Sequence, residues 1–243
     1  MRQYLILIVL ALWGGLVSAT NQAQEQRISA QLASPDLQGE ARWLNAGDQR
    51  FLAIYLKSDG EKRLGGAILL HEAGDNADWP EVIGPLRRHL AQRGWDSLSL
   101  QLPRPFDPLS ETDRRVAIEQ ATGRIQAAFD LFAAEGTEDL VLLGHGLGAE
   151  MALAYVANNT AEQVRGLVAI GLAAGDGGEE DPVLQTITRL QRPMLDLYGE
   201  REEPSLLASA QVRRSTAKRS QIAVYRQDRV AGADHHFLSL IHI

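Results

Sequence analysis

The chain has 243 residues, of which 45% are hydrophobic and 23% are charged, and its formal net charge is −7. These values are typical of a soluble globular protein with one large or two small domains, and the acidic balance argues against nucleic acid or an anionic membrane surface as the main partner. The chain contains no cysteine, which excludes disulfides and thiol chemistry.

The N-terminus has the pattern of a secretory signal peptide. Arg2 precedes the apolar run Leu5–Val17, and Val17-Ser18-Ala19 supplies small residues for cleavage. The run is shorter than the roughly 20 apolar residues of a membrane-spanning helix, although an uncleaved anchor stays open as an alternative. We therefore predict a signal peptide over residues 1–19 and a periplasmic or secreted protein with no stable membrane anchor after cleavage.

The polar segment over residues 20–39 is predicted to be flexible, and residues 40–243 are predicted to form a single domain. Two short β-like runs open this domain, and strands and helices then alternate. The expected strands lie in ARWLNA, FLAIYLKS, GAILLHEAG, WDSLSLQLP, DLVLLG, GLVAIGLA, PMLDLYG and QIAVYRQ. The expected helices lie in WPEVIGPLRRHLAQRG, residues 112–134, GAEMALAYVANN, PVLQTITRL and SLLASAQVRRSTAKR. This alternation predicts an α/β fold with a mostly parallel sheet and helices on both faces.

The end of the chain departs from this pattern. Only seven residues follow His236, and the tail LSLIHI is apolar with nothing to cap a helix. A helix that covers the sheet would normally follow the last strand. We therefore expect a truncated C-terminus that lacks its final helix, and residues 238–243 resemble translated adaptor sequence.

The stretch Leu140–Tyr155, LVLLGHGLGAEMALAY, combines an apolar strand, a sharp glycine turn and a helix. This arrangement is typical of the nucleophile elbow Gly-x-Ser-x-Gly. The centre of the motif is Gly146, however, which has no side chain that could attack a substrate. The turn itself tolerates this exchange, because glycine adopts the strained backbone angles of an elbow readily.

Four segments follow strands and are expected at the carboxyl edge of the sheet, where sites in such folds gather. They are the loop Leu69–Gly74, the elbow, the segment Tyr198–Glu202 and the segment GADHHF with His235. The chain order of backbone-donor loop, elbow, acid and histidine is the order of the parts of an α/β-hydrolase.

Each part resembles its counterpart in the α/β-hydrolase superfamily. The resemblance implies that His235 is the catalytic histidine, that Glu202 is its acid and that Gly146 stands at the nucleophile position. It also implies backbone donors for an oxyanion, at Glu72 and Ala73 in the loop and at Leu147 after the elbow. Longer stretches, including HEAGDNADWPEVIGPLRRHLAQRGWDSLSLQLPRP, are similar to an uncharacterised family of exported α/β-hydrolase-like proteins of Gram-negative bacteria.

Other polar residues near these segments are given supporting roles. We expect His71 to orient the donor loop and His145 and His236 to line the pocket. Glu202 is favoured over Asp196 and Asp176 as the acid. A metal site is not expected, because adjacent histidines on one loop rarely face a single ion and no second ligand pair has useful spacing; no cofactor is predicted.

Three functional hypotheses remain. The leading one is non-catalytic or weakly catalytic binding of a small carbonyl- or carboxylate-bearing ligand, or of a periplasmic protein partner. The second is an ester-type hydrolase in which Glu202 orients His235 and His235 activates water. The third is a dinucleotide-binding protein, because Gly144-x-Gly146-x-x-Ala149 satisfies a Gly-x-Gly-x-x-Gly/Ala fingerprint. Against the third, two strand-helix units precede the motif, and the next strand has no acidic residue at its tip.

Overall fold

The computed structural model describes residues 22–60, 62–159, 162–175, 178, 180–220, 222 and 224–237. The predicted signal peptide, Asp176 and the tail over residues 238–243 lie outside the described residues. Within the described part, no helix is both long and apolar enough to cross a membrane.

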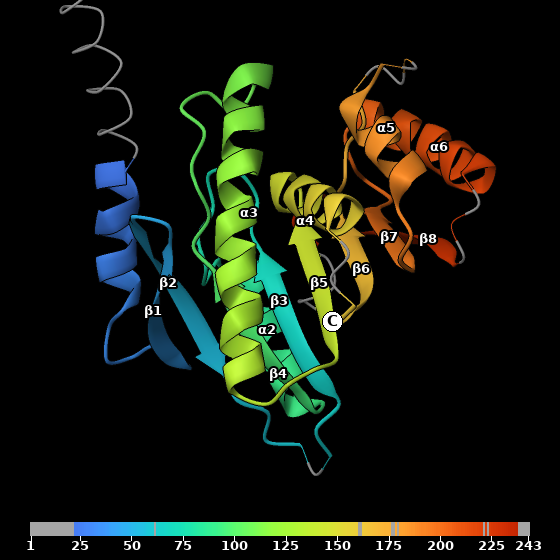
Figure 1. Cartoon of the computed structure of the whole chain (residues 1–243). Helices are drawn as coiled ribbons and strands as arrows, with labels where there is room; N and C mark the ends of the chain where they lie inside the picture. The colour runs from blue at the N-terminus through green and yellow to red at the C-terminus, as the bar shows by residue number, and fades with distance from the viewer. Residues whose placement is uncertain are drawn as a thin grey trace, which may run out of the picture.

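The core of the protein is an eight-stranded sheet in the order β1-β2-β4-β3-β5-β6-β7-β8 (Figure 1). β1 pairs with β2 and β2 with β4 in antiparallel fashion, and all other neighbouring strands are parallel. The strands are β1 (Glu40–Ala46), β2 (Gln49–Leu56), β3 (Gly65–Leu70), β4 (Trp95–Leu100), β5 (Leu140–His145), β6 (Val164–Ile170), β7 (Met194–Gly199) and β8 (Tyr225–Val230). The predicted α/β fold with a mostly parallel sheet is therefore confirmed.

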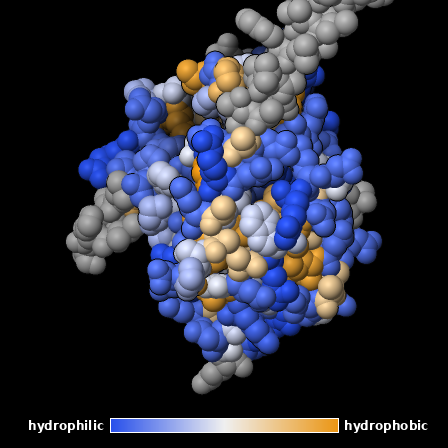
Figure 2. Space-filling view, turned by 90° about the vertical axis from the view of Figure 1, so that its left-hand side faces the viewer, coloured by the Kyte–Doolittle hydropathy of each residue, from blue (hydrophilic) through white to orange (hydrophobic). Residues whose placement is uncertain are grey.

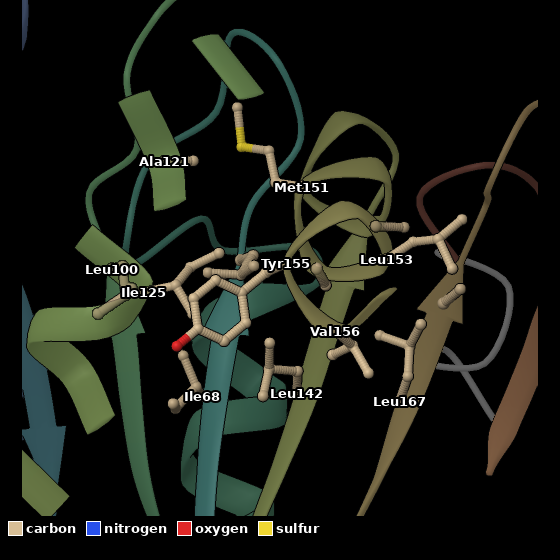
Figure 3. Close-up of a cluster of buried hydrophobic side chains, with 14 of the residues drawn as sticks. Ile68, Leu100, Ala121, Ile125, Leu142, Met151, Leu153, Tyr155, Val156 and Leu167 are labelled. Atoms are coloured by element: carbon tan, nitrogen blue, oxygen red, sulfur yellow. The ribbon is translucent and has the colours of Figure 1, made fainter. Parts of the chain in front are cut away.

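Helices cover both faces of this sheet (Figure 1). They are α2 (Ile83–Gln92), α3 (Glu111–Ala134), α4 (Leu147–Asn158), α5 (Pro182–Arg189) and α6 (Pro204–Arg219). The larger apolar cluster joins α3, α4 and α5 to one face, and a smaller cluster joins α2 to the other. Figure 3 shows part of the larger cluster, where Tyr155 of α4 and Ile125 of α3 lie over Ile68 and Leu142 of adjacent strands. Because both faces are covered, the central strands are almost entirely apolar, as β3 is.

Residues 22–32, which the sequence analysis assigns to a flexible segment, form a helix in the structure. The side chain of Glu25 reaches into the protein and pairs with Arg124 of α3, with 2.6 Å between Oε1 and Nη1. Arg124 also donates to the carbonyl of Gln101, and both charged side chains are buried. This long-range ion pair anchors the segment together with Leu32, which packs against the buried cluster of Leu52 and Ile54. The mostly polar composition of the segment does not reveal the ion pair.

The outer face beside β1 and this helix is mostly hydrophilic, with a small apolar area near its centre (Figure 2). β1 is an edge strand, and its exposed Trp43 lies under the guanidinium of Arg50, 4.9 Å from the ring centroid. The functional candidates lie elsewhere, at the carboxyl edge of the parallel strands.

Candidate functional site

The turn between β5 and α4 keeps the backbone of a nucleophile elbow. Gly146 has φ 52° and ψ −117°, a combination that residues with a side chain rarely adopt. Strand and helix approach each other closely, because a Cβ atom at Gly144 would overlap the backbone of Gly148. The sequence therefore folds into an elbow although its central residue has no nucleophile.

The position of the missing side chain is filled by the carboxylate of Glu72. A Cβ atom built on Gly146 would overlap this carboxylate. Oε1 of Glu72 accepts hydrogen bonds from the backbone N–H groups of Leu147, at 2.9 Å, and of Ala73. Two of the three predicted oxyanion donors thus converge, and they hold a side chain of the protein itself.

The role of Glu72 in the site differs from the predicted one. The sequence analysis predicts that the backbone N–H of Glu72 donates a hydrogen bond to an oxyanion. In the structure, the side chain of Glu72 lies in the site and accepts hydrogen bonds. This role was missed, although a signal was available. Glu72 directly follows His71 in a loop expected to face the elbow, and the residue at the centre of the elbow, Gly146, has no side chain.

The structure brings His235 and Glu202 together with Glu72. Nδ1 of His235 lies 2.9 Å from Oε2 of the buried Glu202, and Nε2 lies 3.4 Å from Oε2 of Glu72. Space for the ring depends on Gly171, where a Cβ atom would come within 2.8 Å of the ring carbon Cε1. One imidazole is therefore flanked by two carboxylates.

The two carboxylates control the charge of the imidazole. The hydrogen bonds with Glu202 and then with Glu72 raise the pKa of His235 to about 10, against an opposing effect of burial. Burial raises the pKa of Glu72, but the hydrogen bonds from His235, Leu147 and Ala73 outweigh it, and the net pKa is lowered. At neutral pH His235 is thus an imidazolium beside the ionised Glu72.

His71 fixes the loop that carries Glu72. Its Nε2 accepts the backbone N–H of Leu102 at 3.0 Å, so the ring proton is on Nδ1, which donates to the carbonyl of Glu72 at 2.7 Å. Burial lowers the pKa of His71 to about 4, and the ring is therefore neutral in this bridge. His71 thus ties the loop after β3 to the loop after β4.

His145 and His236 lie against His235. The ring centroid of His145 is 4.8 Å from that of His235, and its Nε2 donates to the backbone carbonyl of His235 at 2.9 Å. The ring of His236 is 5.5 Å from that of His235, and its Nδ1 lies 3.2 Å from a carboxylate oxygen of Glu81. In the described part of the chain, no group of three potential ligands is arranged to hold a metal ion.

Asp75 adds a second carboxyl group close to the histidines. Its Oδ2 lies 4.0 Å from Nδ1 of His145, and neither atom has a hydrogen-bond partner among the described residues. Burial, followed by the charges of Glu72 and Glu81, raises the pKa of Asp75 to about 7. Asp75 therefore titrates near neutral pH, unlike an ordinary aspartate.

The competing acid, Asp196, is engaged elsewhere. Its carboxylate is buried and receives two hydrogen bonds from Arg213, at 2.9 and 3.1 Å, and others from Tyr225 and Gln227. This network joins β7, α6 and β8, and it leaves Glu202 as the acid in contact with His235.

The strand order, the elbow and the position of the histidine define the class: the chain has an α/β-hydrolase fold. Solved structures of that class support this. Est1E of Butyrivibrio proteoclasticus is 12% identical, with a TM-score of 0.63 over 83% of this chain and 93% of its own. An α/β serine hydrolase homologue of Coxiella burnetii is 14% identical, with a TM-score of 0.62 over 85% and 93%. A putative dienelactone hydrolase of Klebsiella pneumoniae is 18% identical, with a TM-score of 0.62 over 80% and 86%.

The chain belongs to the family described as "Protein of unknown function (DUF3530)", whose model matches residues 15–122 and 107–233. Among curated proteins, none matches the sequence.

Proposed function

We propose that this protein does not perform serine-type acyl transfer and that its hydrolase-like site binds a small ligand with a carboxylate or a carbonyl group. The observation that carries the proposal is the position of the Glu72 carboxylate. Its carboxylate accepts the N–H groups of Leu147 and Ala73 and lies beside the imidazolium of His235. An internal carboxylate in this position indicates the chemistry that the site accommodates.

A ligand would bind by exchanging with Glu72. Two backbone N–H groups and a charged imidazole form charge-assisted hydrogen bonds with a carboxylate, and these are stronger than neutral ones. Because Glu72 is tethered beside the donors, its effective concentration is high, and a free ligand competes at a disadvantage. We therefore expect weak binding of simple carboxylates, and tighter binding of ligands that make further contacts.

The two alternative functions have less support. A histidine that activates water must be neutral, whereas the flanking carboxylates hold the pKa of His235 at about 10. A dinucleotide would place its pyrophosphate at the start of α4, where the anionic Glu72 repels it. We further propose, from the signal-like N-terminus, that binding of the ligand or of a protein partner takes place in the periplasm or outside the cell.

Titration with acetate tests the proposal. We expect Glu72→Ala to bind acetate at least tenfold more tightly than the wild type, because the donors and the imidazolium then lack their internal partner. Adding His235→Gln to this variant should remove most of the gain. Glu111→Ala, at an exposed glutamate in the first turn of α3, is the matched control and should behave as the wild type. Equal acetate affinity of the wild type and Glu72→Ala would contradict the proposal.

A further inference from the structure

We propose that Glu72 is a carboxylate nucleophile whose substrates are epoxides, which open with a proton from His235 and are then hydrolysed with the help of Leu147 and Ala73. This inference goes beyond the proposed function. There, a ligand displaces Glu72 from its donors; here, Glu72 stays seated and reacts.

The two carboxylate oxygens of Glu72 have different partners. Oε1 is held by the backbone N–H groups of Leu147 and Ala73, and Oε2 faces Nε2 of His235 at 3.4 Å. Carboxylates are established nucleophiles in covalent catalysis. The side chains of Glu72 and His235 are 20% and 31% exposed, so a small electrophile from solvent can reach both.

The hydrogen bonds to Oε1 of Glu72 exclude acyl substrates and favour transfer of an alkyl group. In acyl transfer the two N–H groups must stabilise an oxyanion on the substrate, but here Oε1 of Glu72 already engages them. They can act instead on an oxyanion that forms on Oε1 itself. Such an oxyanion arises when water attacks an ester of Glu72, and an ester of Glu72 forms by attack on a saturated carbon.

The charged histidine selects the leaving group. When Oε2 attacks an epoxide carbon, the ring carbon–oxygen bond breaks and its electron pair goes to the oxygen. Nε2 of His235, protonated in the resting state, lies beside Oε2 and transfers its proton to that oxygen. The products of this step are a hydroxyalkyl ester of Glu72 and a neutral imidazole.

The same histidine completes the cycle. Esterification removes the negative charge of Glu72, which had helped to raise the pKa of His235, so the neutral imidazole can take a proton from water. The hydroxide adds to Cδ of Glu72, and Leu147 and Ala73 stabilise the oxyanion on Oε1. The bond between Cδ and Oε2 then breaks with its electron pair on Oε2, and the proton of the hydroxyl group added to Cδ passes to that oxygen. The diol leaves, Glu72 is again a carboxylate, and His235 keeps the proton taken from water as an imidazolium. The sum is epoxide plus water to diol.

A single turnover of styrene oxide in water enriched in a heavy oxygen isotope tests this route. Because the Cδ–Oε2 bond breaks, the first diol carries an oxygen of Glu72, and the label enters Glu72 instead. Mass spectrometry of the peptide that contains Glu72 should show the label, and the diol of the first turnover should not. Label in the diol with none in Glu72 would overturn the proposal and favour direct attack by water.

Two variants separate the steps. His235→Gln should lower steady-state turnover by roughly 10²–10⁴-fold, and on long incubation it should accumulate an adduct of one styrene oxide on Glu72. The exposed Glu111 of the same protein should carry none. Glu72→Gln should form no adduct at this position. Absence of both turnover and adduct would sink the proposal, whereas the acetate titrations would be unaffected by that result.

Discussion

The carboxylate of Glu72 and a side chain at Gly146 would compete for the same space. A Cβ atom on Gly146 overlaps the carboxylate, and the N–H of the following residue, Leu147, binds it. The glycine at this turn therefore makes room for an acid from a different loop. The carboxylate of Glu72 thus occupies the space that a side chain at position 146 would take.

Restoring the serine should consequently require two substitutions. Gly146→Ser alone should be destabilised by about 1–3 kcal/mol from its backbone conformation, plus the overlap with Glu72, and it should not react with a fluorophosphonate. Combining it with Glu72→Gly frees both the position and the two N–H donors, and the double variant should be labelled covalently. Glu72→Gly alone is the control. Equal labelling of Gly146→Ser and the double variant would show that Glu72 does not obstruct the elbow.

His235 should remain charged well above its ordinary pKa of 6.5, with a midpoint at about 10. Nuclear magnetic resonance of its ring protons across a pH series measures this. Since the folded-state pKa is raised, the stabilisation is fully present below 6.5 and is lost as the pH rises through about 10. Glu72→Gln should lower the midpoint, whereas Glu81→Gln, whose carboxylate faces His236, should change it far less. A midpoint near 6.5 in the wild type would contradict the charged arrangement.

Asp75 should make the free energy of unfolding depend on pH in a lower range than His235 does. Its pKa is raised from 3.8 to about 7, so ionisation destabilises the folded state increasingly between these values and by a constant amount above them. Asp75→Asn removes this effect. It should raise the free energy of unfolding by on the order of 1–3 kcal/mol above pH 7 and change it little below pH 3.8. Thermal unfolding across the pH range measures the difference; a gain independent of pH would rule out this cause.

Substitutions of Asp196 and Glu202 should have different effects, the first on stability and the second on the pKa of His235. Asp196→Asn leaves Arg213 buried without its charge partner, and we expect a loss of about 3–5 kcal/mol in denaturant unfolding with little change in the pKa of His235. Glu202→Gln should lower the pKa of His235 and leave the network around Arg213 intact. A large shift of the His235 pKa in folded Asp196→Asn would mean that Asp196 acts on the site.

Glu25 should anchor the helix over residues 22–32. Glu25→Gln weakens the buried pair with Arg124, and we expect amide hydrogen exchange in this helix to speed up while β3 and β5 keep their protection. Glu40→Gln, at an exposed position, is the control. Unchanged exchange in the helix would show that the ion pair is not its anchor.

Much of the fold was predictable because it depends on local patterns. Continuous apolar runs such as β3 follow from burial on both faces of the sheet, and the glycine-rich turn after β5 follows from the close approach of strand and helix. The parallel arrangement then places the ends of β3, β5, β6 and β7 at one edge. The chain order, together with the resemblance to α/β-hydrolases, was thus enough to nominate His235, Glu202 and Gly146 as neighbours.

The helix over residues 22–32 was not predictable in this way. Its residues are mostly polar, and such a composition favours disorder. Its position depends on Arg124, about a hundred residues further along the chain, which offers Glu25 a buried partner. A contact of that separation leaves no periodic signal in the segment itself.

The sequence by itself determined the α/β-hydrolase fold, the elbow and the absence of a serine, since these depend on residue order, on spacing and on the kinds of side chain present. Only the tertiary structure decided that Glu72 points into the elbow and converts His235 to an imidazolium. The direction of that side chain depends on two backbone N–H groups and on the bridge from His71 to Leu102. These contacts join three loops, and folding alone brings the loops together.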